Sequence, residues 1–190
     1  MRTTIIYGSH RENRLGINAV MFFQKLLTTR GQHVDVIDSL QENLPVLDKR
    51  YMDYEAGKAP TNLERLAEIY RKSDGFLVVA GEYNHTIQPG LKNLLDYFYT
   101  EYFHRPAGIV SYSIGDGAGQ RAAMTLRPNL AALGMVTIPK MCAIGKLGDK
   151  IDANGKPLTD SMASFGERFI DEFEWYQRAL KNAHKSDPMT

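Results

Sequence analysis

Apolar and polar residues along this chain fall into blocks that predict strands, each followed by a helix. Five short apolar runs have the length and the β-branched or aromatic content of strands. The third, Gly75-Phe76-Leu77-Val78-Val79-Ala80, is continuous, as expected for a central strand covered on both faces. The predicted strands cover residues 3–7, 33–37, 75–80, 107–113 and 135–144.

After every predicted strand, apolar residues recur with the three- and four-residue spacing of an amphipathic helix. The predicted helices lie within residues 13–29, 61–70, 91–98, 122–133 and 165–180, and Pro128 should kink or break the fourth. Strands that alternate with helices in this way form a parallel sheet with helices on both faces. We expect an α/β fold, a three-layer sandwich whose five-stranded parallel sheet has the order 2-1-3-4-5.

The length of 190 residues and an apolar content of 43% fit one domain with a single sizeable core. We predict that residues 1–184 form this domain and that 185–190 are a flexible tail. Residues 39–60 lack a sustained period and form a long connection, which in a compact domain is often functional.

Charge and cysteine content exclude several classes of function. The formal net charge is +1, from 23 basic and 22 acidic residues, so nothing points to nucleic acid or a membrane surface as partner. The single cysteine, Cys142, lies in an apolar run, which favours a buried packing role and a reducing compartment. The carboxylates within 149–160 do not have the spacing of a calcium loop, so no metal site is assigned. We expect a cytoplasmic protein.

Polar loops follow the first, third and fourth strands, and all three should meet at the carboxyl edge of the sheet, beside the switch point where ligands bind. The first loop leads into a helix N-terminus, where free backbone N–H groups and the helix dipole favour an anion. Ser9 adds a hydroxyl, and Arg11 and Arg14 add guanidinium groups that match a phosphate. An ordinary solvated turn with two surface arginines is the alternative for this stretch taken alone.

The other two loops offer groups suited to a flat heterocycle. Tyr83 has an aromatic face, Asn84 has an amide, and the glycines within 115–119 let the backbone approach closely. A phosphate end and a planar end together describe a mononucleotide. Neither the dinucleotide nor the triphosphate glycine motif is present in the sequence. Read without its context, the second loop is an ordinary polar turn.

Two motifs resemble one known family. They are Gly8-Ser9-x-Arg11-x-x-Arg14-x-Gly16 and Glu82-Tyr83-Asn84-x-x-x-x-Pro89-Gly90-Leu91-Lys92-Asn93-x-x-Asp96. In combination they are similar to the NAD(P)H-dependent FMN reductases, a family of flavodoxin-like fold that includes quinone, azo and chromate reductases. Ser111-Tyr112-Ser113 resembles the third flavin loop of that family. The sequence departs from the family pattern in having Gly81 in place of a proline and Ser113 in place of a glycine.

The resemblance implies an FMN-dependent enzyme that takes hydride from NADPH or NADH and reduces a small-molecule acceptor. It implies a homodimer or homotetramer, in which part of the aromatic cluster at residues 97–103 lies at a subunit interface. Because the cofactor carries the chemistry, we assign no catalytic acid or base, and His85 and His104 are read as polar packing. The residues implied around the FMN phosphate are Ser9, Arg11, Arg14, Leu15 and Gly16, and those along the isoalloxazine are Glu82, Tyr83, Asn84, His85, Tyr112 and Ser113.

Three alternatives stay open from the sequence. The first is a flavodoxin-type electron carrier, although such carriers are typically acidic and this chain is near neutral. The second is an FMN-dependent redox sensor that regulates a protein partner. The third is a flavodoxin-like domain without flavin. The acceptor also stays open among a quinone, an azo compound, a metal oxyanion and free flavin.

Overall fold

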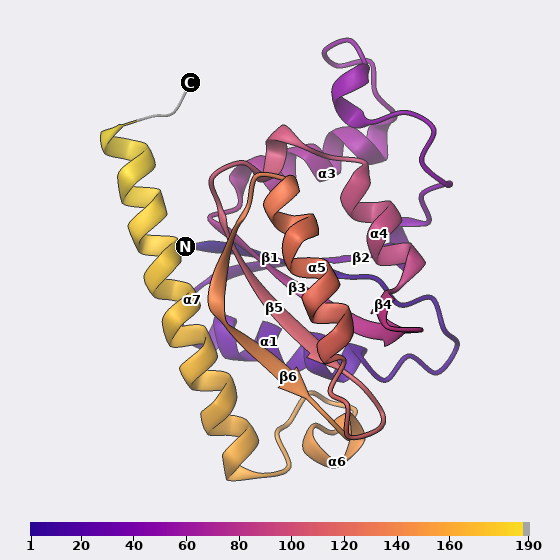
Figure 1. The fold of residues 1–190 in the computed structure, drawn as a ribbon. Helices are drawn as coiled ribbons and strands as arrows, with labels where there is room; N and C mark the ends of the chain where they lie inside the picture. The colour runs from indigo at the N-terminus through magenta and orange to yellow at the C-terminus, as the bar shows by residue number, and fades with distance from the viewer. Residues whose placement is uncertain (188–190) are drawn as a thin grey trace.

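A single twisted sheet of parallel strands forms the centre of the molecule (Figure 1). The computed structural model describes residues 1–187. The five long strands lie in the order β2-β1-β3-β5-β6, so the predicted order is confirmed once the two-residue β4 is set aside. This order is the flavodoxin-like form of the doubly wound sheet, with its switch point between β1 and β3. The strand bounds are β1 Arg2–Tyr7, β2 His33–Asp38, β3 Gly75–Tyr83, β4 Thr86–Ile87, β5 Pro106–Tyr112 and β6 Val136–Ile144.

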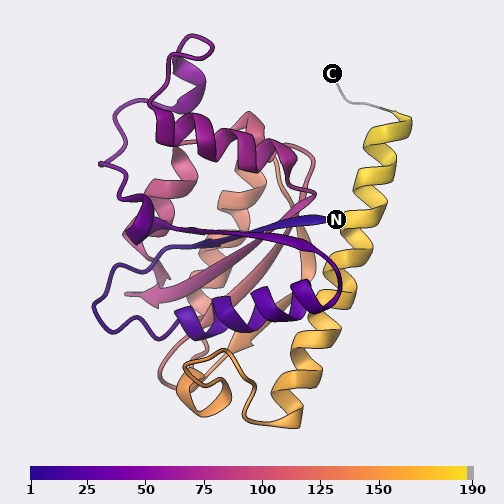
Figure 2. The same cartoon turned by 180° about the vertical axis from the view of Figure 1, so that it is seen from behind.

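Helices cover both faces of the sheet. On one face α1 (Ile17–Thr29) and α7 (Asp160–Ser186) pack in one apolar cluster, and on the other α3 (Thr61–Lys72), α4 (Pro89–Asp96) and α5 (Gln120–Ala132) pack in a second. Figures 1 and 2 show α5 and α1 on opposite sides of the strands. The short elements are α2 Ser39–Glu42, η1 Tyr51–Asp53, η2 Thr100–Tyr102 and α6 Leu147–Lys150.

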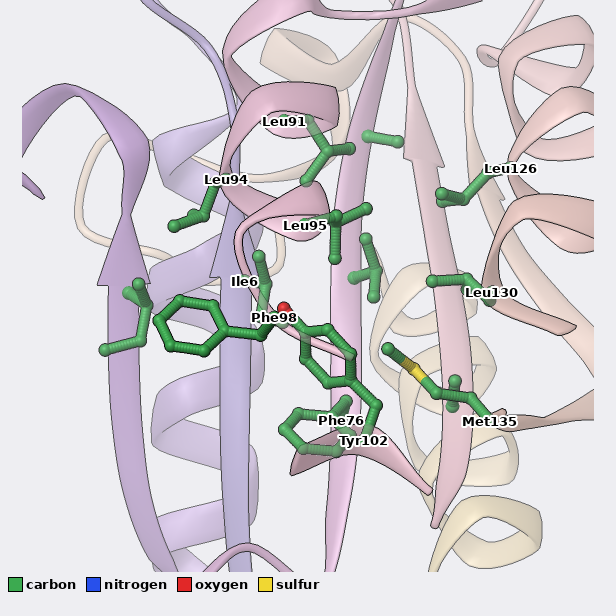
Figure 3. Packing of buried hydrophobic residues seen from close by; sticks show 14 of the residues in the cluster. Ile6, Phe76, Leu91, Leu94, Leu95, Phe98, Tyr102, Leu126, Leu130 and Met135 are labelled. Carbon is green, nitrogen blue, oxygen red and sulfur yellow. The ribbon is translucent and has the colours of Figure 1, made fainter. Parts of the chain in front are cut away.

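The two clusters follow from the alternation of side chains along a strand. Ile5 belongs to the α1 and α7 side and Ile6 to the opposite side, and both are fully buried. On the α3–α5 side, Phe98 and Tyr102 pack with Phe76 beneath α4 (Figure 3). Tyr97, Phe98 and Tyr102 of the predicted aromatic cluster are therefore core residues, whereas Tyr99 and Phe103 are half-buried.

Several boundaries differ from the predictions. The third predicted strand ends at residue 80, but β3 continues through Tyr83 and pairs with the antiparallel β4. Asn84 and His85, with φ of 48° and 67°, form the two-residue turn between them, which is the backbone of a type I′ hairpin. The first helix begins at Ile17, and α5 continues through Pro128 without the predicted break.

At the C-terminal end, α7 runs to Ser186 and so includes the first two residues of the expected tail. Residues 188–190 of that tail lie outside the described residues. Cys142 is buried, as expected, and burial raises the pKa of its thiol. Within residues 1–187, no helix has the length and apolar character needed to cross a membrane.

Candidate functional site

The turn from Gly8 to Gly16 leaves the carboxyl end of β1 and leads into α1 (Figure 2). Ser9 is only 2% exposed, and its hydroxyl lies at the base of the turn. Within residues 1–187, the backbone N–H groups of residues 11–13, which precede α1, donate to no protein acceptor, whereas the first N–H groups of α1 itself already donate to the carbonyls of residues 14–16. Unpaired backbone donors in a turn that leads into a helix N-terminus favour an anion.

An ion pair holds this turn against the neighbouring strand. The Nη1 atom of Arg14 lies 2.5 Å from Oδ1 of Asp38 and also donates to the carbonyl of Ser9 at 3.3 Å. The side chains are 16% and 2% exposed, and the carboxylate holds the pKa of Arg14 above its ordinary value. Arg14 therefore fastens the turn in this structure. The sequence analysis missed Asp38, although an acidic residue at the end of the strand beside β1 was a usable signal.

Arg11 points the other way, toward the second loop. It is exposed, and its guanidinium carbon lies 4.8 Å from the ring centroid of Tyr83, within the range of a cation–π contact. The hydroxyl of Tyr83 lies 3.4 Å from that of Ser9. The structure thus brings the two sequence motifs together, as their positions at neighbouring strand ends predicted.

A buried chain of polar groups lies beneath the first turn. The hydroxyl of Tyr112 is 3.4 Å from that of Tyr7 and accepts a hydrogen bond from Nε2 of Gln88 at 3.1 Å. Burial raises the pKa of both tyrosines. A Cβ on Gly16 would come within 2.2 Å of the Tyr112 ring, so the turn rests directly on this side chain. The sequence did not identify Tyr7 and Gln88 as residues near the site, because a tyrosine within a buried strand and an amide in a loop have no distinctive pattern.

The β3–β4 hairpin presents the other predicted residues of the second loop. Asn84 and His85 form its exposed tip. The carboxylate of Glu82 accepts from the backbone N–H of Arg121 at 3.2 Å and pairs with its guanidinium at 3.1 Å, which ties the hairpin to the start of α5. His104, by contrast, lies two residues before the start of β5, and so is at the opposite edge of the sheet.

The backbone of the loop after β5 is hydrogen-bonded to the neighbouring segment at the end of β6. Ser113 donates its N–H to Ile144 at 3.1 Å and its hydroxyl to the carbonyl of Gly115 at 2.7 Å, while Lys146 donates its N–H to Gly115 at 2.9 Å. Nothing lies within 4 Å of a Cβ placed on Gly115 or Gly117, so one side of the loop is open. Leu15, from the first turn, is half-buried and packs with the α1–α7 cluster.

A groove of about 810 Å³ lies beside the first turn, within the size range of small-molecule sites. Its lining comes from the turn at Gly8–Arg11, from residues 44–47, from Tyr83, and from α4 with the residues just before it. Arg11 and Tyr83 therefore belong both to the meeting point of the loops and to the groove. Within residues 1–187, no group of three or more histidine, cysteine or acidic side chains is placed to hold a metal ion.

These features define a class: a doubly wound domain with a turn of unpaired backbone donors at its switch point and a groove of small-molecule size next to it. A sequence profile of the NADPH-dependent FMN reductases matches residues 1–149, and this chain belongs to that family. The family consists of NAD(P)H-dependent oxidoreductases that use FMN and quinones.

Individual proteins agree with this assignment. A quinone reductase of Pseudomonas putida is 32% identical over 127 residues, which cover 64% of this chain and 68% of that protein. An NAD(P)H-dependent FMN reductase of Nectria sp. is 32% identical over 136 residues, covering 68% of this chain and 67% of that protein. The structure of the flavoenzyme NAD(P)H:(acceptor) oxidoreductase FerB from Paracoccus denitrificans has a TM-score of 0.73, with 22% identity and coverage of 92% and 98%, and shares the fold.

Proposed function

We propose that this chain holds FMN across the loops that follow β1, β3 and β5, and uses it to oxidise NADPH or NADH and reduce a small-molecule acceptor. Membership of the FMN reductase family supports this assignment. The arrangement of donors in the first turn supports it independently, because that turn suits a phosphate.

The phosphate end is the better defined part of the proposed site. The unpaired N–H groups of residues 11–13, the hydroxyl of Ser9 and the guanidinium of Arg11 form a donor set of the kind that binds a phosphate ester. Leu15 and Gly16 continue this turn into α1, and Arg14 fastens it to Asp38. In this proposal Arg11 binds the phosphate and Arg14 keeps the turn in shape.

The ring end of the proposed site, which would hold the isoalloxazine of FMN, lies between the β3–β4 hairpin and the loop after β5. Tyr83, Asn84 and His85 offer an aromatic face and polar edges at the hairpin, and Glu82 holds the hairpin to α5. On the opposite side, Ser113 and the open faces of Gly115 and Gly117 leave room for a planar group. The buried side-chain oxygen Oε1 of Gln88 has no partner among the described residues, and Tyr112 supports the floor.

When bound, FMN supplies the two-electron chemistry, accepting a hydride from the nicotinamide and returning the electrons to the acceptor. The chain itself then needs only to bind the cofactor, orient it and leave one ring face accessible. In this proposal no side chain is required to move a proton.

The observation that carries the proposal is the group of unpaired N–H donors beside Ser9 and Arg11. Titration of the purified protein with FMN and with riboflavin, followed by flavin fluorescence, tests it. We expect FMN to bind about 100-fold more tightly, because several charge-assisted hydrogen bonds go to the phosphate. Equal affinity for the two flavins would contradict the proposed phosphate site.

Anaerobic mixing of the FMN-loaded protein with NADPH separates a reductase from the other functions. Rapid bleaching of the flavin absorbance is expected of a reductase, whereas an electron carrier is not reduced directly by the nicotinamide. Slow turnover with every acceptor, together with partner binding that changes on reduction, identifies a redox sensor instead.

We also infer a cytoplasmic homodimer or homotetramer. Exposed apolar side chains support self-association, among them Trp175 at 59% and Met124 at 60% exposure. One buried cysteine is consistent with a reducing compartment. Sedimentation velocity of the FMN-loaded protein measures the oligomeric state, and a monomer at every concentration contradicts this inference.

A further inference from the structure

A second cavity, of about 330 Å³, lies at the end of β6. Its lining comes from residues 143–145 at the end of that strand, from Lys150 at the end of α6, and from the first turns of α7. These three segments meet at the N-terminal end of α7 (Figure 1). No residue that lines this cavity belongs to the first turn, the β3–β4 hairpin or the groove described above, so it is a separate feature of the molecule.

The floor of the cavity is apolar. Ile144 and Met162 are 2% and 5% exposed and belong to the buried cluster beneath α1 and α7, and Phe165 is half-buried and packs against that cluster. Side chains of this kind bury the apolar body of an organic ligand. The volume lies at the lower end of the range for small-molecule sites, so the cavity suits a compact ligand.

The wall that carries Lys150 is fixed by contacts to the rest of the fold. The carbonyl of Lys150 accepts a hydrogen bond from the N–H of Leu158 at 2.8 Å. The next residue, Ile151, is fully buried, and its carbonyl accepts from Nδ2 of Asn18 on α1 at 3.2 Å. Leu147, which begins α6, is also fully buried. The cavity is therefore built into the fold.

Two cationic side chains line the cavity, and no acidic side chain does. Lys150 is half-buried, and Arg168 of α7 is exposed. A lysine close to them, Lys140, is paired with Glu172 at 3.3 Å. Within residues 1–187, by contrast, no carboxylate forms an ion pair with Lys150 or Arg168. The cavity thus has positive charge that the described part of the chain does not neutralise.

The combination of charge and apolar floor selects among ligands. A guanidinium and an ammonium group from two different walls are suited to donate to one carboxylate, and the hydroxyl of Ser161 adds a further donor. A neutral ligand would leave both cations without a partner. A small inorganic anion would leave the floor uncovered. An anion with an apolar body satisfies both parts of the cavity.

We propose that this cavity binds a small organic carboxylate, such as a benzoate-like aromatic acid. The apolar body packs on Ile144, Met162 and Phe165, and the carboxylate accepts hydrogen bonds from Lys150 and Arg168. The site does not depend on the proposed function, because none of these residues is assigned to the flavin.

Isothermal titration calorimetry of the full chain saturated with FMN tests the proposal. The probes are benzoate, its neutral analogue benzamide, and acetate, which has the carboxylate without the ring. We expect benzamide to bind about tenfold more weakly than benzoate, because it loses the charge-assisted hydrogen bonds. Acetate should also bind about tenfold more weakly, because it leaves the floor uncovered.

Substitution of the two cations locates the site. Arg168→Gln and Lys150→Gln should each raise the Kd for benzoate about tenfold and leave the Kd for FMN unchanged. Arg178→Gln is the matched control, since Arg178 is also an exposed arginine of α7 but lies outside the cavity, and benzoate should bind this variant as it binds the wild type.

Several outcomes would overturn the carboxylate site. One is failure of benzoate to bind the wild type, and another is an equal Kd in the wild type and in both cavity variants. Displacement of benzoate by FMN also overturns it, because it places the anion at the first turn. Acetate binding as tightly as benzoate removes the role of the floor. Failure of FMN to bind overturns the proposed function alone, because the same benzoate titrations are then read on the flavin-free protein.

Discussion

The turns after β1 and after β5 have the same place in the fold and different structures. Both follow a buried parallel strand, contain glycine and end at a helix on the same edge of the sheet. In the turn after β5, Ser113 and Gly115 exchange backbone hydrogen bonds with residues 144–147. In the turn after β1, the N–H groups of residues 11–13 have no protein acceptor within residues 1–187, and a side-chain ion pair provides the anchor.

The difference teaches which turn is able to bind a charged group. A turn whose backbone groups are already paired offers a ligand mainly space, whereas a turn held by a side chain keeps its backbone donors available. The first turn is therefore suited to an anion and the third to a flat, uncharged surface. Four predictions follow from this contrast, beginning with the largest expected effect.

Breaking the anchor of the first turn should have the largest effect. Arg14→Leu leaves the carboxylate of Asp38 buried without its partner, so the free energy of unfolding should fall by about 3 kcal/mol. Urea denaturation followed by circular dichroism measures it. Lys146→Leu is the control in the third turn, where the exposed pair with Asp116 should make no measurable contribution. Equal losses in the two variants would contradict the proposed role of Arg14.

Adding a methyl group distinguishes the crowded turn from the open one. Gly16→Ala forces a Cβ against the Tyr112 ring and should destabilise the protein by about 2 kcal/mol. Gly117→Ala meets nothing within 4 Å and should stay within about 0.5 kcal/mol of the wild type. Thermal unfolding of both variants checks this pair, and a tolerated Gly16→Ala would mean that Tyr112 moves aside easily.

Removing Arg11 should affect the ligand and not the fold. Arg11→Ala loses a charge-assisted hydrogen bond of about 1.5 kcal/mol, so the Kd for FMN should rise by roughly tenfold. Because Arg11 is exposed and loses only the cation–π contact with Tyr83, the stability of the flavin-free protein should fall by less than about 1 kcal/mol. Riboflavin titration is the control, since its affinity should be the same in wild type and variant. A parallel loss of riboflavin affinity would assign Arg11 to the ring end.

The smallest effect concerns the hydroxyl of Tyr112. Tyr112→Phe should cost about 1 kcal/mol at pH 8, since Gln88 loses its acceptor. Burial raises the pKa of Tyr112 in the folded state, so its stabilising contribution is complete below the unfolded pKa of about 10 and is lost as the pH rises further. The difference between variant and wild type should therefore shrink between pH 8 and pH 11 in urea denaturation. A constant difference would contradict the buried position.

Much of the fold follows from local pattern. The alternation of apolar residues along the strands and their helical spacing elsewhere predicted every long element and the order of the sheet. Strand boundaries were predicted less accurately where strand pairing decides them. β3 continues through Tyr83 because β4 pairs with it, but the segment is polar and therefore resembles a loop in the sequence. Of the site, the convergence of Ser9 and Arg11 with Tyr83 was predictable, because neighbouring parallel strands end at one edge.

The sequence by itself determined the class of fold, the positions of the turns and the donor residues in the first of them. Only the tertiary structure decided that Arg14 binds Asp38, that Tyr112 lies beneath Gly16, and that Asn93 of α4 donates to the carbonyl of Pro45. The physical reason is the range of the interactions. Periodicity and turn chemistry act over a few residues, whereas these contacts depend on strand register, such as the pairing of Tyr7 with Asp38, which no local pattern specifies.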